Sequence, residues 1–150
     1  MFKKIVVPLD GSLLAECTLP YIRTLIKDGA VEEVILLHVV MVNFDWYTVK
    51  EDFDFSAFRE NLITESRKYL EEVRNKCNSE GIEVKTESIE GSFPAQTITD
   101  YAKKNAADMI VMSTHGRTGK KILMFGGTAL SVLHDSHVPV LLIRPESCRT

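Results

Sequence analysis

Short apolar runs alternate along this sequence with segments of helical periodicity. The runs are rich in β-branched residues and bounded by turn-forming residues, as buried strands are. We expect five strands, at Ile5–Val7, Val34–Val40, Ile82–Thr86, Met109–Met112 and Val138–Ile143. Parallel strands need crossover connections that are usually helices. The alternation therefore predicts an α/β fold: one doubly wound, five-stranded, mainly parallel sheet with helices on both faces, as in Rossmann-like domains.

Residues at helical spacing fill the intervals between these strands. In the first helix, Pro20 lies inside the pattern and should kink it, because proline removes a backbone hydrogen bond. Ser92 is expected to cap a helix that begins near Pro94. In the last helix, Leu130 and Leu133 are expected to face the core.

The segment Met41–Phe55 breaks this periodicity and combines aromatic residues with several acids. A disordered linker is poor in aromatic residues. We therefore interpret the segment as an ordered loop or a lid. A long helix that ends near Gly81 is expected to follow it.

Length, charge and cysteine usage narrow the function classes. A chain of 150 residues predicts a single domain, residues 1–150, and an apolar content of 45% is enough to bury a core. The net charge of −3 argues against nonspecific nucleic-acid binding, which needs a basic surface. No apolar run reaches the roughly 18 residues that span a bilayer, so we expect no membrane partner. Three scattered cysteines without a CxxC spacing indicate reduced thiols in a cytoplasmic protein.

A glycine-rich stretch, Ser113–Thr128, leaves the fourth predicted strand and enters a helix. In doubly wound sheets, ligands bind beyond the carboxyl ends of the strands where the strand order reverses. We expect the first and fourth strands to flank that point. Glycines let a phosphate approach backbone amides, and the amides at a helix start attract anions. The stretch predicts a phosphate site, although the same glycines could merely turn the chain.

Side chains of this stretch add charge and hydroxyl groups that could contact an anion: Arg117, Lys120, Lys121, Thr114, Thr118 and Thr128. His115 could touch phosphate or shape the turn, and we favour the turn. The stretch is no Walker loop, because Thr114 and Lys121 depart from the pattern GxxxxGK[ST].

Segments spread over nearly the whole chain resemble the universal stress protein family. They are Val6–Ser12, Leu36–Val39, Asp108–Gly119 and Pro139–Leu142. The resemblance implies the fold of adenine nucleotide alpha hydrolase-like proteins and, in one branch of the family, an adenine nucleotide as ligand.

The nucleotide-binding branch has a pattern similar to G-x-x-G, nine residues, then G-[ST]. Gly116 and Gly126 fit this pattern, whereas Ser113 replaces the first glycine and Gly127 replaces the hydroxyl residue, with Thr128 beside it. Ser113 could crowd the phosphates or forbid the backbone angle that glycine permits. The hydroxyl lost at Gly127 is worth about 0.5–1.5 kcal/mol. We still expect ATP, ADP or AMP to bind, with Mg²⁺ as a candidate companion of the phosphates.

The resemblance also implies roles for residues at the ends of the strands. Asp10 would accept hydrogen bonds from the ribose or adenine side, and Val39 would face the base through its backbone. Leu9 and Met112 would line the adenine pocket, with Pro8 beside them. Two alternatives stay open: Asp10 as a cap of the first helix, and Val39 and Met112 as packing residues.

Histidines and cysteines give weaker signals. His134 and His137 lie near a helix end, but no second cluster has zinc-like spacing, so we expect no metal site and assign no catalytic residue. His38 falls in a predicted strand and is interpreted as a hydrogen-bonded core residue. Cys17 and Cys77 fall on inward helix faces and suit small core positions.

The sequence favours a binding module in stress response or regulation, in which the nucleotide biases conformation or partners. One alternative is a slow ATPase or phosphotransferase, which needs in-line positioning and charge stabilisation. Another is a stress protein that has lost nucleotide binding and acts through its dimer surface. The last strand, Val138–Ile143, contains Pro139, which suits a sheet edge, so we expect a homodimer through this strand.

Overall fold

The alternation of strands and helices is present in the computed structural model, which describes residues 2–43, 47, 50–78, 84–114 and 127–144. Its elements, in chain order, are β1 (Phe2–Leu9), α1 (Leu13–Glu16), α2 (Leu19–Lys27), β2 (Val31–Val40), α3 (Phe55–Asn78), β3 (Val84–Glu90), α4 (Pro94–Lys104), β4 (Met109–Ser113), α5 (Gly127–Asp135) and β5 (Val140–Ile143). Among the described residues, no helix is long and apolar enough to cross a membrane.

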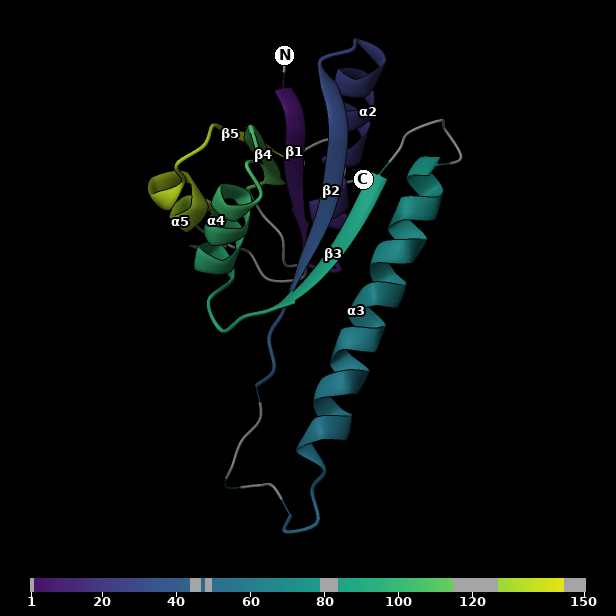
Figure 1. Ribbon diagram of the computed structural model, residues 1–150, viewed down its shortest axis with the longest axis vertical. Coiled ribbons are helices and arrows are strands. Elements are labelled where there is room, and N and C mark those ends of the chain that lie inside the picture. Colours follow the sequence, from purple (N-terminus) through teal and green to yellow (C-terminus); the bar gives the residue numbers. More distant parts are fainter. Residues whose placement is uncertain (1, 44–46, 48–49, 79–83, 115–126, 145–150) are drawn as a thin grey trace.

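The sheet is open, has the strand order β3-β2-β1-β4-β5, and pairs every neighbouring strand in parallel. The predicted fold class is confirmed. The chain winds outward from β1 through β2 to β3 and then returns to the other side of β1 with β4 (Figure 1). The strand order therefore reverses between β1 and β4, where the sequence places the ligand.

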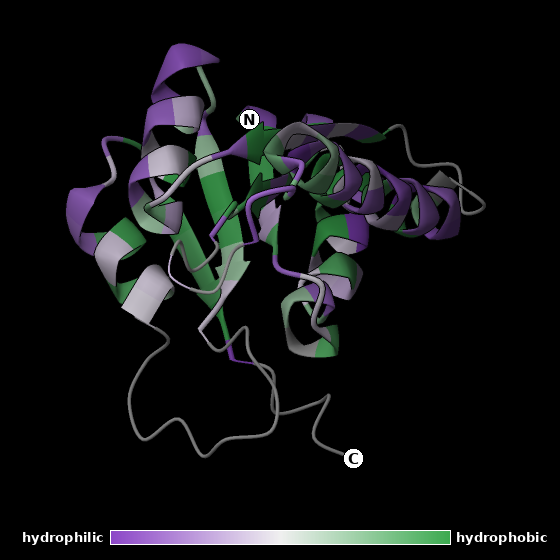
Figure 2. Cartoon of the chain, turned by 90° about the horizontal axis from the view of Figure 1, so that it is seen from below, coloured by the Kyte–Doolittle hydropathy of each residue, from purple (hydrophilic) through white to green (hydrophobic). Residues whose placement is uncertain are grey.

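Alternate residues of the strands feed two separate apolar cores. Ile5, Val7 and Leu9 of β1 pack on one face with α3 residues such as Leu70. Val6 packs on the other face with residues of α4 and α5. Figure 2 shows the consequence: hydrophobic strands lie between helices whose outer faces are hydrophilic. Each such side chain, when fully buried, contributes about 1.5–3 kcal/mol.

The first helical segment is two helices rather than one kinked helix, which corrects the expectation for Pro20. α1 ends at Glu16, and α2 begins at Leu19 with Pro20 in its first turn. A missing N–H costs nothing there, because the first amides of a helix have no intrahelical partner. The buried Thr18 between the helices donates its hydroxyl to the Ala15 carbonyl over 2.9 Å.

Two further helix predictions are wrong. The N-cap of α4 is Phe93, without a side-chain capping bond, so Ser92 is not the cap. Its start is fixed instead by Pro94, whose φ is already helical. On α5, Leu130 and Leu133 are 51% and 49% exposed. The smaller Ala129 and Val132 face the core in their place, which lets α5 lie close to the sheet.

The bounds of two strands, the state of the cysteines and the loop agree only in part with the sequence-based expectations. β5 begins at Val140 rather than Val138, and β3 begins at Val84, with residues 82 and 83 outside the described part. Cys77 is a buried, reduced cysteine, as expected. Cys17 is buried but disulfide-bonded, contrary to the prediction of a reduced thiol.

The predicted loop or lid, 41–55, lies partly outside the described residues. Within it, the ring centroid of Phe53 lies 5.6 Å from that of Phe58 on α3.

Candidate functional site

A cavity of about 650 Å³ opens at the carboxyl end of the sheet, across the point where the strand order reverses. It is bounded by the ends of β1, β2 and β4, by α1 and α3 on one face of the sheet, and by the starts of α4 and α5 on the other. The sheet topology thus gathers residues far apart in the sequence into one site.

The predicted site residues that are described all line this cavity: Pro8, Leu9, Asp10, Val39, Met112, Ser113, Gly127 and Thr128. The other four, His115, Gly116, Arg117 and Gly126, lie outside the described residues. That any of them binds a ligand stays a prediction.

The cavity has two walls of different chemistry. The wall on the α1 and α3 side carries polar side chains, namely His38, Glu65, Ser66 and Tyr69. The wall on the α4 and α5 side is mainly apolar and is formed by Val39, Pro94, Ile98, Met112 and Ala129. The apolar wall suits a flat, weakly polar group, and the polar wall suits a group that makes hydrogen bonds.

Asp10 organises the turn between β1 and α1. Its Oδ1 accepts hydrogen bonds from the Ser12 amide at 2.9 Å and from the Ser12 hydroxyl at 2.5 Å. The Ser12 hydroxyl in turn accepts from the amide of Ala15 at 3.2 Å. Ser12, not Asp10, is therefore the cap of α1, which corrects the capping alternative. Within the described residues Oδ2 of Asp10 accepts no hydrogen bond, so this oxygen can receive one from a ligand.

His38, which the sequence analysis interprets as a core residue, lines the cavity from the end of β2. Its Nδ1 lies 2.6 Å from Oγ of Ser66, and its ring packs edge-on against Tyr69 with centroids 5.8 Å apart. Burial lowers the pKa of His38, and the charge of Asp10 opposes that shift only in part. The predicted hydrogen bond exists, but the signal for a site residue was its position one residue before Val39.

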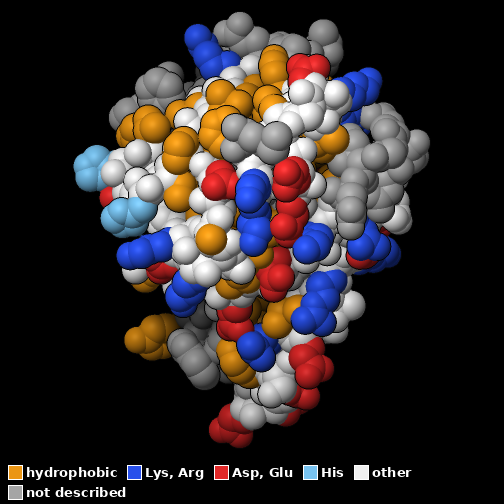
Figure 3. Space-filling view, turned by 45° about the horizontal axis from the view of Figure 1, so that its top comes forward, with side chains coloured by type: hydrophobic (Ala, Val, Ile, Leu, Met, Phe, Trp, Pro, Cys, Tyr) orange, Lys and Arg blue, Asp and Glu red, His pale blue; other side chains and the backbone are white. Residues whose placement is uncertain are grey.

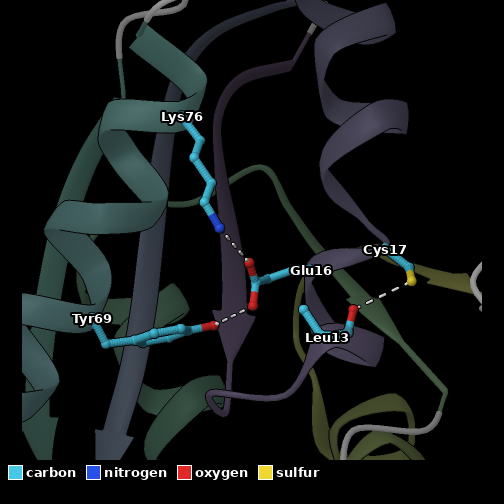
Figure 4. A network of polar contacts seen from close by, with 5 residues as sticks. All are labelled: Leu13, Glu16, Cys17, Tyr69 and Lys76. Atoms are coloured by element: carbon cyan, nitrogen blue, oxygen red, sulfur yellow. Dashed lines mark hydrogen bonds and ion pairs between the residues drawn. The ribbon is translucent and has the colours of Figure 1, made fainter.

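Tyr69 joins the polar wall to α1 (Figure 4). Its hydroxyl donates to Oε2 of Glu16 at 3.3 Å, and Nζ of Lys76 lies 3.8 Å from Oε1 of the same carboxylate. Burial, with the Glu16 charge adding to it, raises the pKa of Tyr69. In the same view, the sulfur of Cys17 lies 3.3 Å from the carbonyl oxygen of Leu13, one turn earlier.

Thr114 brings an unsatisfied hydroxyl to the cavity. Its amide donates to the carbonyl of Ile143 at 3.0 Å, which fixes the backbone at the end of β4. The side chain is 4% exposed, and its Oγ1 has no hydrogen-bond partner among the described residues. A buried hydroxyl without a partner costs about 1–3 kcal/mol, which a ligand that bonds to it would recover.

The structure describes the backbone at Ser113 and the space beside Gly127, the two positions that depart from the glycine pattern. Ser113 is a buried β4 residue paired with Ile143, and it is not among the described residues with positive φ, so no glycine is needed there for backbone reasons. No atom of the described residues lies within 4 Å of the place where a Cβ would stand on Gly127. A serine would therefore displace none of the described neighbours.

His134 and His137 are not part of a metal-binding cluster of described residues. Nδ1 of His134 lies 2.8 Å from the carboxylate of its exposed neighbour Asp135. In the described part of the chain, no group of three His, Cys, Asp or Glu residues could hold a metal ion.

Residues 1–144 match the model described as the universal stress protein family. The chain belongs to this family.

Related proteins are consistent with that assignment. Universal stress protein MJ0531 of Methanocaldococcus jannaschii is 31% identical over 144 residues, which cover 96% of this chain and 83% of the relative. The solved structure of MJ0577 from the same organism superposes with a TM-score of 0.79 at 30% identity, covering 96% of each chain. A universal stress protein family member from Arabidopsis thaliana, solved with AMP bound, has a TM-score of 0.68 at 18% identity and covers 99% of this chain and 95% of its own.

Proposed function

We propose that this universal stress protein is a regulatory binding module for an adenine nucleotide, formed by one domain that spans residues 1–150. The observation that carries the proposal is the cavity between the ends of β1 and β4, which unites an apolar wall, the free Oδ2 of Asp10 and the unsatisfied hydroxyl of Thr114. The family member from Arabidopsis thaliana that was solved with AMP supports the ligand class.

The two walls fit the two ends of a nucleoside. The apolar wall, with Val39 and Met112, can cover the faces of a purine base, which is flat and weakly polar. Asp10 lies at the end of β1, between the walls, where its Oδ2 can accept from a ribose hydroxyl or the base.

The phosphates would lie toward the start of α5. The free amides at the start of this nine-residue helix attract anions, and Thr128 adds a hydroxyl beside Gly127. Thr114 supplies a further hydroxyl donor from β4. The sequence places Gly116, Arg117 and Gly126 in the intervening stretch, and Mg²⁺ would accompany the phosphates as their counter-ion.

We further propose that the protein acts as a homodimer through β5. This strand pairs only with β4 in the described sheet, so its other edge is open. Leu130 and Leu133 of α5, with Leu141 of β5, leave apolar surface exposed nearby. Figure 3 shows hydrophobic side chains gathered in the upper part of the face it views, while acidic and basic side chains intermingle below. Light scattering at micromolar concentration should give twice the chain mass of 16.9 kDa, and a monomeric mass would refute the dimer.

Release of bound ligand tests the nucleotide proposal. The purified protein is denatured, and the supernatant is separated by chromatography and identified by mass spectrometry. We expect an adenine nucleotide that is absent from an Asp10→Ala preparation. If a nucleotide is found, incubation with ATP and Mg²⁺ over hours separates a binding module, which leaves ATP intact, from a slow ATPase, which releases ADP.

A further inference from the structure

The imidazole of His38 is held by a chain of two serine hydroxyls. Its Nδ1 lies 2.6 Å from Oγ of Ser66 on α3, and that oxygen lies 2.8 Å from Oγ of Ser88 on β3. Ser66 is only 3% exposed. The chain therefore links β2, α3 and β3 beneath the polar wall of the cavity.

The direction of the protons along this chain follows from the partners of Ser88. If Ser88 donates to Ser66, and Ser66 donates to His38, every hydroxyl proton has an acceptor. In the opposite direction the proton of Ser88 would have no acceptor within the described residues. Ser88 is half-buried, so in that direction its proton would be left to solvent instead of a protein acceptor. The chain thus favours the tautomer in which Nδ1 accepts and Nε2 carries the hydrogen.

The second ring nitrogen is the one left for a ligand. Nδ1 is turned toward Ser66, so Nε2 lies on the opposite side of the ring, and no residue of the described chain forms a hydrogen bond with it. The edge-on contact with Tyr69 fixes the plane of the ring. Both aromatic side chains line the cavity.

The charges of this wall decide which group it can accept. Glu65 lines the cavity on the same side as His38, and Asp10, between the walls, lies near enough for its charge to act on His38, so two carboxylates face this part of the cavity. Two carboxylates repel a phosphate, whereas a hydroxyl can donate to one of them and accept from an imidazole N–H.

We propose that His38 is a ligand-binding residue that donates from Nε2 to a sugar hydroxyl of the bound nucleotide, with Ser66 and Ser88 as positioning residues. This inference rests on the proposed function, since it assigns the ribose to the α3 wall and the phosphates to α5.

Two substitutions of the same histidine separate its two nitrogens. The amide of His38→Gln reaches the position of Nε2, whereas that of His38→Asn reaches only the position of Nδ1. Calorimetric titrations compare AMP with 2′,3′-dideoxy-AMP, which lacks both hydroxyls. We expect His38→Asn to weaken AMP binding about 3- to 10-fold, as for one lost hydrogen bond. His38→Gln should retain most of the affinity, and neither change should alter dideoxy-AMP binding.

An equal loss for both ligands in His38→Asn, or no loss for AMP, would overturn the assignment. If the wild-type protein binds neither AMP nor ATP, the proposed function fails and this inference fails with it. If the wild type binds but the pattern of losses differs, only the inference fails.

The positioning role has a readout that needs no nucleotide. Imidazole ¹⁵N shifts of the ligand-free protein should show the Nε2–H tautomer at His38 in the wild type. In Ser66→Ala the shifts should move toward a mixture of tautomers. Two results would refute the positioning role: His38 in the Nδ1–H form in the wild type, or no change of its tautomer in Ser66→Ala. Neither result would contradict the nucleotide proposal.

Discussion

The hydroxyl of Tyr69 donates to the carboxylate of Glu16, so the short helix α1 is fastened to the long helix α3 at the rim of the cavity. Lys76 lies near the same carboxylate from further along α3. The turn that contains Asp10 and Ser12 precedes α1 directly, so the hydrogen bond between Tyr69 and Glu16 helps to hold this turn in place.

Tyr69→Phe should lower the free energy of unfolding by about 0.5–1.5 kcal/mol, because it removes the donor to Glu16 and leaves the ring in place. Urea unfolding followed by circular dichroism measures the change. Tyr21→Phe, at a 46% exposed ring on α2, is the matched control and should be neutral. An equal loss of stability in both variants would contradict a stabilising role of the hydrogen bond between Tyr69 and Glu16.

Thr114→Val should stabilise the ligand-free protein by about 1 kcal/mol, because an unpartnered buried hydroxyl is replaced by a methyl group of the same shape. Thr99→Val is the control of opposite sign, since the buried Thr99 hydroxyl donates to the carbonyl of Gln96 at 3.0 Å. Thermal unfolding measures whether each substitution raises or lowers the stability of the protein. Thr114→Val should also weaken ATP binding several-fold, and a destabilised protein with unchanged affinity would refute the role of this hydroxyl.

Gly127→Ser should strengthen ATP binding about 2- to 10-fold, because it supplies the hydroxyl that the nucleotide-binding pattern has at this position. The site has room for the new Cβ. Gly127→Ala adds the same carbon without the hydroxyl and should leave the affinity unchanged. A gain in the alanine variant equal to that in the serine variant would show that the hydroxyl plays no part.

Acid should destabilise the fold through His38. Burial lowers its folded-state pKa, so the unfolded chain binds the proton more readily than the folded one. The contribution of His38 to stability is therefore full above the unfolded value of about 6.5 and is lost as the pH falls below it. Urea midpoints at pH 7.5 and 5.0 should differ less in His38→Gln than in the wild type.

The exposed His134 provides the control for this pH effect, because its side chain is 86% exposed. His134→Gln should keep the pH dependence of the wild type. A His38→Gln variant with the wild-type dependence would show that another group carries it.

Strands were predicted well because their apolar character is local and two-sided. Val34–Leu37 is buried on both faces of the sheet, and its continuous apolar sequence indicates this directly. Helix faces were predicted less well, because packing distance decides them. Leu130 and Leu133 are the largest apolar residues of α5, but the face that packs on the sheet consists of Ala129 and Val132.

The place of the cavity was predicted, because the topology of alternating strands and helices determines where the strand order reverses. The roles of Asp10 and Val39 were inferred from the family resemblance; both residues line the cavity at the carboxyl ends of β1 and β2, and ligand binding by them stays a prediction. His38 was missed as a cavity residue, because its role depends on Ser66 and Ser88, which lie far away in the sequence and meet it only in the folded chain. The same holds for Tyr69, whose partner Glu16 is 53 residues earlier.

Calorimetric titration of the wild-type protein with ATP, with GTP as the comparison ligand, tests the central claim most directly. The account predicts saturable binding of ATP at about one equivalent per chain, weaker binding of GTP, and a marked loss of ATP affinity in Asp10→Ala. No heat of binding for ATP up to millimolar concentration, from a protein that is folded by circular dichroism, would contradict it.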